Sequence, residues 1–152
     1  MDNPSRGNNL LSIRRLTVED AGAAAELCSQ LGYPNSADEL CKRIEERSRT
    51  TDSVVFAAVV DGQVVGWIDA FIEQHLQGSA SVVIAGIVVR DTVRGMGIGK
   101  RLCLEVEDWA RERSIPLVRV RSQIMREDAH RFYLRDGYHK VKTSVVFEKT
   151  VL

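Results

Sequence analysis

Residues 81–100 read SVVIAGIVVRDTVRGMGIGK and join an apolar run to a glycine-rich loop. The run is apolar on both faces, which is typical of a central strand that is covered on each side. Gly95, Gly97 and Gly99 follow, directly before a segment with helical spacing. Backbone N–H groups in such a loop can converge on an anion, with the positive end of the helix dipole behind them. The stretch therefore predicts a strand, a phosphate-binding loop and a helix in succession.

Periodicity along the rest of the chain predicts a single α/β domain over residues 10–152, after a disordered segment at residues 1–9. Apolar residues at spacings of four, four and three, from Ile98 to Trp109, predict a helix after the loop. The Asp-Gly turn at residues 61–62 predicts a β-hairpin. We expect helices at 18–31, 37–47, 98–113 and 127–135, and strands at 11–16, 54–60, 64–76, 81–89, 117–122 and 141–149. The order β-α-α-β-β-β-α-β-α-β predicts a mixed sheet with helices on both faces.

Composition excludes several classes of protein. Lys plus Arg (21) equals Asp plus Glu (21), so no net basic charge favours nucleic acid as a partner. The three cysteines lack the spacing of a disulfide framework or a zinc site, so we expect no metal and a reducing cytoplasm. The first ten residues are polar and no apolar run of membrane-spanning length occurs, so we expect neither a signal peptide nor a membrane partner.

Two common phosphate-binding motifs do not fit the glycine loop. A Walker A loop requires a glycine five residues before its Gly-Lys pair and Ser or Thr after it, but Arg94 and Arg101 occupy these places. A dinucleotide-binding loop requires GxGxxG and an acidic residue at the end of the next strand, which here reads LVRVRS. Both alternatives are therefore rejected.

The spacing of Arg94, Gly97 and Gly99 resembles motif A of the GNAT superfamily of acyl-CoA-dependent N-acetyltransferases. A second segment, AHRFYLRDGY at residues 129–138, resembles the FYxxxGF signature of the same family. The resemblance covers residues 11–149 and implies a GNAT-like fold with a mostly antiparallel, twisted sheet. It also implies that the chain is an enzyme with acetyl-CoA as its acyl donor.

The resemblance implies a binding site for each part of the donor. The strand residues Ile87, Val88 and Val89 would pair with the pantetheine arm, and the Val89 amide would donate to the thioester carbonyl. The pyrophosphate would be bound by the Arg94 side chain and by the backbone amides of Gly95, Met96, Gly97, Ile98, Gly99 and Lys100.

Further donor contacts are expected in the segment from residue 122 to residue 133. Many family members hold the pantetheine with an Asn for which the nearest equivalents here are Ser122 and Gln123. His130 is a further candidate contact with the cofactor. Tyr133 occupies the tyrosine position of the second signature and would protonate the departing thiolate as a general acid.

The general base is not at its usual place, because Ala85 stands where many members carry a Glu in the central strand. Asp69, Glu73 and His75 alternate along the preceding strand and could face one cleft. An imidazole accepts a proton readily near neutral pH. We therefore rank His75 first and Glu73 second as the candidate base.

These features predict transfer of an acetyl group to a primary amine of a small molecule, by direct attack in a ternary complex. Two alternatives remain open. Without catalysis, the chain would be an acyl-CoA sensor or a partner subunit; with catalysis, it could instead acetylate a protein N-terminus or lysine. We also expect the closing strand at 141–149 to pair in a homodimer.

Overall fold

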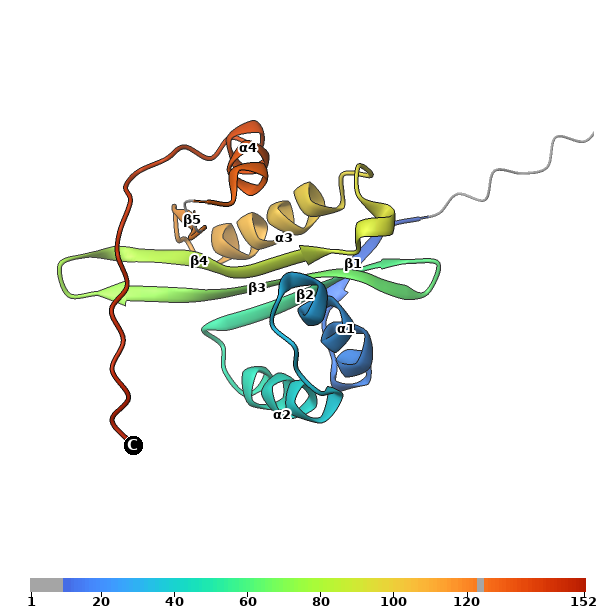
Figure 1. Cartoon of the computed structure of the whole chain (residues 1–152). Helices are drawn as coiled ribbons and strands as arrows, with labels where there is room; N and C mark the ends of the chain where they lie inside the picture. The colour runs from blue at the N-terminus through green and yellow to red at the C-terminus, as the bar shows by residue number, and fades with distance from the viewer. Residues whose placement is uncertain (1–9, 123–124) are drawn as a thin grey trace, which may run out of the picture. The chain divides into compact units, whose positions relative to one another are not determined.

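The computed structural model describes residues 10–122 and 125–152 (Figure 1). Residues as far as Val120 form one compact unit, and Arg121–Leu152 form a second. Residues 1–9, for which we expect disorder, lie outside the described residues. None of the described helices is long and apolar enough to cross a membrane.

The first unit contains a five-stranded sheet with the order β1-β2-β3-β4-β5. Its strands are β1 (Ser12–Arg15), β2 (Ser53–Val60), β3 (Gln63–His75), β4 (Gly78–Val89) and β5 (Val118–Val120). Neighbours from β1 to β4 are antiparallel, whereas β5 runs parallel to β4. The expected mixed, mostly antiparallel sheet is therefore confirmed.

Helices cover both faces of this sheet, as predicted. Figure 1 shows α1 (Ala21–Leu31) and α2 (Ala37–Ser48) on one face and α3 (Ile98–Glu112) on the other. The apolar stripe of α3 is buried and comprises Ile98, Leu102, Cys103, Val106, Trp109 and Ala110. On the opposite face, Leu27 of α1 packs in one cluster with Ala57, Val64 and Val88. The central strands are thus covered from both sides, as their apolar sequence requires.

The helix expected from residue 18 begins instead as a short 3-10 turn, η1 (Val18–Asp20), and α1 starts at Ala21. Asp20 is buried and accepts hydrogen bonds from Arg14 at 2.7 and 2.9 Å. It also accepts from the backbone N–H of Thr17 at 2.8 Å. The side chain therefore joins β1 to the start of α1.

In the second unit, α4 (Glu127–Arg135) has the predicted bounds. The strand predicted at residues 141–149 is wrong for the chain by itself, because the structure assigns no strand there and every residue from 139 to 152 is exposed. The alternation that suggested a strand is present in the sequence. A strand forms only where a neighbour supplies hydrogen-bond partners, and the described residues pair none with this segment.

The Asp20 interactions predict how stability depends on pH. Hydrogen bonding to Arg14, against the opposing effect of burial, holds the pKa of Asp20 below its ordinary value. The stability that Asp20 contributes is therefore present above the ordinary carboxyl pKa and is lost as the pH falls through the lowered one. We expect Asp20→Asn to lower the free energy of unfolding at pH 7 by about 2 kcal/mol.

Urea unfolding at pH 7 and pH 3 measures this effect. The difference between Asp20→Asn and the wild type should shrink at pH 3, because this pH lies below the ordinary carboxyl pKa and unfolding of the wild type then takes up a proton at Asp20. Asp61→Asn, in the exposed β2–β3 turn, is the control and should change little. An equal loss for Asp20→Asn at both pH values would show that the charge of Asp20 is not what stabilises the fold.

Candidate active site

The pairing between β4 and β5 ends partway along β4, and this leaves an open backbone edge. The parallel register joins Val82 to Val118 and ends where Ile84 meets Val120. The next residue, Ala85, is exposed and forms a β-bulge. Neighbouring residues of β3 pair with Ile84 and with Gly86, so Ala85 is an extra residue in β4. From Gly86 to Val89, β4 remains paired with β3 but has no strand on its other side in the described part of the chain.

The direction of the backbone groups along this edge follows from two hydrogen bonds. The N–H of Val82 donates to Leu117 on the β5 side, before the extra residue. Beyond it, the N–H of Arg90 donates to Val65 of β3 at 2.7 Å. Because successive residues of a strand point in opposite directions, the N–H groups of Ile87 and Val89 point to the open edge.

The glycine loop follows at the end of this edge, as predicted. A 3-10 turn, η2 (Asp91–Val93), leads into Gly95 and Gly97, which have φ values of +87° and +74°. Gly97 is the N-cap of α3, and its left-handed conformation is one that a residue with a Cβ adopts at a cost. Gly97 has no side chain that could bond the first turn of α3, so the backbone N–H groups of that turn can face an anion.

Gln30 of α1 bridges the end of β4 and the start of the loop. Its side-chain Nε2 donates to the carbonyl of Val89 at 2.8 Å, and its Oε1 accepts from the N–H of Asp91 at 3.1 Å. One turn earlier, Glu26 lies 3.9 Å from the guanidinium of Arg90. Gln30 therefore holds the backbone at the point where the edge becomes the loop.

Sequence reasoning missed Gln30 because its partners are backbone groups about 60 positions away. Nothing in the local pattern of α1 distinguishes Gln30 from an ordinary exposed polar residue. Only the expectation that α1 packs on β4 could have pointed to it.

The candidate base residues lie in the C-terminal half of β3. Nε2 of His75 lies 3.3 Å from Oε2 of Glu73, so the structure brings these two together. Asp69 instead forms an ion pair with Arg47 of α2, and that guanidinium also donates to Ser53 at 2.9 Å. Asp69 is opposite Gly86, and Glu73 is four residues further along, roughly 13 Å at strand spacing.

The other predicted site residues belong to the second unit. Tyr133 is buried on α4, with its ring centroid 5.3 Å from that of Phe132 and 6.0 Å from that of Tyr138. His130 lies on the same helix, one turn earlier, and is partly exposed. Oγ of Ser122 is buried and has no hydrogen-bond partner among the described residues. Gln123 lies outside the described residues.

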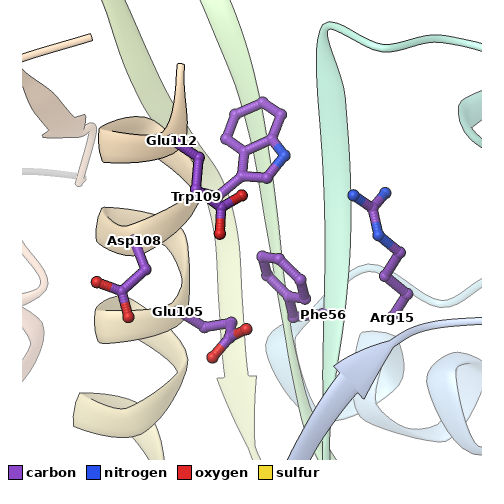
Figure 2. A pocket seen from close by; sticks show the side chains of 6 residues that line it. All are labelled: Arg15, Phe56, Glu105, Asp108, Trp109 and Glu112. Atoms are coloured by element: carbon purple, nitrogen blue, oxygen red, sulfur yellow. The ribbon is translucent and has the colours of Figure 1, made fainter. Parts of the chain in front are cut away.

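A separate hollow of about 220 Å³ lies between β1, β2 and the C-terminal half of α3 (Figure 2). Figure 2 shows three carboxylates from α3 on one side and Arg15 on the other. The lining residues are Arg15, Phe56, Glu105, Asp108, Trp109 and Glu112. None of them belongs to the glycine loop or the open edge, and the acidic side chains would repel a phosphate-bearing donor. The hollow is therefore not the donor site.

Comparisons with known proteins agree with this geometry. The sequence matches the Acetyltransferase (GNAT) family over residues 19–138. It is 33% identical over 129 residues to an aminoalkylphosphonate N-acetyltransferase of Salmonella typhimurium, with 83% of each chain covered. It is 26% identical to the aminoglycoside N(6')-acetyltransferase type 1 of Stenotrophomonas maltophilia, covering 90% of this chain and 91% of that protein.

Solved structures show the same fold. An aminoglycoside N-acetyltransferase in complex with CoA superposes with a TM-score of 0.86, although only 19% of residues are identical. The alignment covers 97% of this chain and 99% of the other. The family match over most of the chain, with this fold and an open strand edge that leads into a glycine-rich loop, identifies the protein as an acetyl-CoA-dependent N-acetyltransferase of the GNAT family.

Proposed function

We propose that the chain transfers the acetyl group of acetyl-CoA to a primary amine of a small molecule, within a ternary complex. The observation that carries this proposal is the open edge of β4, which leads without a break into the glycine loop. The edge presents backbone groups for an extended amide-containing chain, and the loop presents N–H groups for a phosphate. Acetyl-CoA carries both chemical groups in that order.

Each part of the donor has a proposed partner. The amides of Gly95–Lys100 and the side chain of Arg94 bind the pyrophosphate. Ile87 and Val89 pair with the pantetheine arm, and Ser122, Gln123 and His130 are further proposed contacts. The carbonyl of Val89 accepts a hydrogen bond from Gln30, whereas its N–H points to the open edge. That N–H is our proposed donor to the thioester oxygen, where negative charge develops.

The reaction needs a new C–N bond, a broken C–S bond and two proton transfers. The amine nitrogen attacks the thioester carbon, and the amine loses a proton toward Glu73 or His75 through water. Tyr133 donates its phenolic proton to the departing sulfur and is restored by proton exchange. Of the two candidate bases, Glu73 is nearer to the open edge of β4 by strand spacing. Its carboxylate lies against the imidazole of His75.

The acceptor is best sought among amines that do not depend on a strongly acidic site. Arg47 neutralises Asp69, the carboxylate opposite the start of the open edge. This pairing weakens the case for a polycationic acceptor such as an aminoglycoside. The relative of higher identity is named for aminoalkylphosphonates, which carry one amine and an anionic group. We therefore propose aminoalkylphosphonates before aminoglycosides.

Donor binding and acceptor choice are tested in one set of measurements. Acetyl-CoA at 100 times its dissociation constant should stabilise the fold by about 2.7 kcal/mol. Arg94→Ala should weaken this binding at least several-fold, and Arg49→Ala, which removes an exposed arginine at the end of α2, should not. Release of the CoA thiol is then followed with aminoalkylphosphonates, aminoglycosides, polyamines and a peptide N-terminus. Binding without release for every amine would support a sensor instead.

Replacing Tyr133 with Phe tests the general acid. The ring and its contacts with Phe132 and Tyr138 stay, and only the proton donor is removed. We expect kcat to fall about 100-fold or more with little change in the affinity for acetyl-CoA. Tyr138→Phe is the matched control and should retain activity. Normal turnover in Tyr133→Phe would assign the thiolate proton to another group.

Replacing Gln30 with Ala tests the bridge between α1 and the loop. Without the two hydrogen bonds, Val89 and the first turn of the loop lose their fixed position, so the KM for acetyl-CoA should rise about 3- to 10-fold. Gln63→Ala, at an exposed position of the β2–β3 hairpin, is the control. Since Gln30 contacts no reacting atom in this scheme, kcat at saturating donor should fall less than the KM rises. An unchanged KM would mean that the bridge is only a surface contact.

A further inference from the structure

The guanidinium of Arg47 is held in one position over β2 and β3. Its Nε donates to Oγ of Ser53 at 2.9 Å, and its Nη1 donates to Oδ2 of Asp69 at 3.1 Å. Its Nη2 donates to the second carboxylate oxygen of Asp69 and to the carbonyl of Ala70. Ser53 is in turn hydrogen-bonded to the hydroxyl of Thr50 at 2.7 Å. The planar, charged group is therefore fixed before any ligand arrives.

The pair of Arg47 and Asp69 still has hydrogen-bonding capacity to offer. The two side chains are 33% and 24% exposed. A guanidinium has five N–H groups, and the contacts use one at Nε, one at Nη1 and two at Nη2. The second N–H of Nη1 therefore has no partner in the described part of the chain. Each oxygen of the Asp69 carboxylate accepts one of these bonds and has room for a second.

The order of the strands places this pair beside the open edge of β4. Ser53 begins β2, Asp69 belongs to β3, and Asp69 lies opposite Gly86, where the open edge begins. Asp69 is thus one strand spacing, about 5 Å, from β4, and Arg47 lies over β2 and β3 on the side away from the edge. A donor that follows the edge away from the glycine loop directs its acyl end toward Gly86. The charged pair therefore lies on the approach to the acyl group.

Trp67 supplies an apolar surface next to the pair. It lies two residues before Asp69 on β3, so the two side chains share one face of the sheet. Trp67 is partly exposed and packs against apolar residues of α1 and α2. Its ring also lies against Gly86, where an added Cβ would come within 3.2 Å of the indole. The edge and the charged pair are therefore flanked by an aromatic ring.

We propose that Arg47 binds the anionic group of the acceptor and so selects a small amine that carries a phosphonate. This inference rests on the proposed transfer to a small amine. The remaining N–H of Arg47 donates to a phosphonate oxygen in a charge-assisted hydrogen bond. The unused lone pairs of Asp69 attract the cationic amine on the β4 side, before it loses its proton. The short alkyl chain lies on Trp67, and the amine points toward the acyl group.

Three matched ligands test this role by calorimetric titration of the whole chain in the presence of CoA. Aminoethylphosphonate carries both groups, ethylamine lacks the anion, and ethylphosphonate lacks the amine. Arg47→Gln should weaken the binding of aminoethylphosphonate about 10-fold or more and change that of ethylamine less than about 3-fold. Arg47→Lys keeps the charge without the planar fork and should give an intermediate loss. Arg49→Gln, at the exposed end of α2, is the control and should bind all three as the wild type does.

Asp69→Asn distinguishes recognition of an anion from a purely structural ion pair. This change removes the carboxylate that competes for the guanidinium, so ethylphosphonate should bind more tightly than to the wild type. A pair that only joins α2 to the sheet predicts the opposite, because breaking it from either side would then weaken every ligand alike. Thermal unfolding shows whether each variant is folded.

Release of the CoA thiol separates this inference from the proposed function. If the binding of aminoethylphosphonate depends on Arg47 but no amine releases CoA, the assignment of Arg47 stands and the proposed transfer fails. If Arg47→Gln binds aminoethylphosphonate normally, or loses it and ethylamine to the same extent, Arg47 does not recognise the anion, whichever amines react.

Discussion

The site depends on the point at which β5 stops pairing with β4. A central strand paired on both sides has no backbone groups to offer, however suitable its side chains are. Here the parallel pairing ends at Ile84 and Val120, and the extra residue Ala85 follows immediately. The four residues from Gly86 to Val89 then give roughly 13 Å of one-sided strand. One local change in register thus converts core structure into a binding edge.

The parallel direction of β5 fixes where the proposed phosphate site lies. Two parallel neighbours need a crossover, and α3 is that crossover. Its first turn must follow the carboxyl end of β4, so the positive end of the helix dipole lies where the open edge finishes. The apolar cluster that contains Leu27 and Val88 holds α1 against the same strand, and Gln30 can therefore reach Val89 and Asp91. Apolar packing between α1 and the sheet therefore positions the hydrogen-bonded bridge made by Gln30.

Much of this architecture could be predicted from sequence because its signals are local. The glycine loop, the stripe from Ile98 to Trp109 and the Asp-Gly turn each depend on neighbouring residues, and the predicted bounds of α4 were correct. The bridge from Gln30 and the pairing of Arg47 with Asp69 could not be predicted, since each joins segments that are distant in sequence. The strand at residues 141–149 failed for a related reason: strand pattern is local, but strand pairing needs a partner.

The pairing of Arg47 with Asp69 also limits how the amine can be activated. An ionised carboxylate next to the open edge would be a convenient base, but the carboxylate of Asp69 is paired with the guanidinium of Arg47, which also bonds Ser53. With alanine at position 85, no other acidic side chain of β3 lies as close to the edge. In the proposed reaction, Glu73 or His75 then removes the proton through water, or the acceptor amine arrives already neutral. An acceptor amine of low basicity would need the least help, so turnover should depend on the pKa of the amine more steeply than in an enzyme with a carboxylate at position 85.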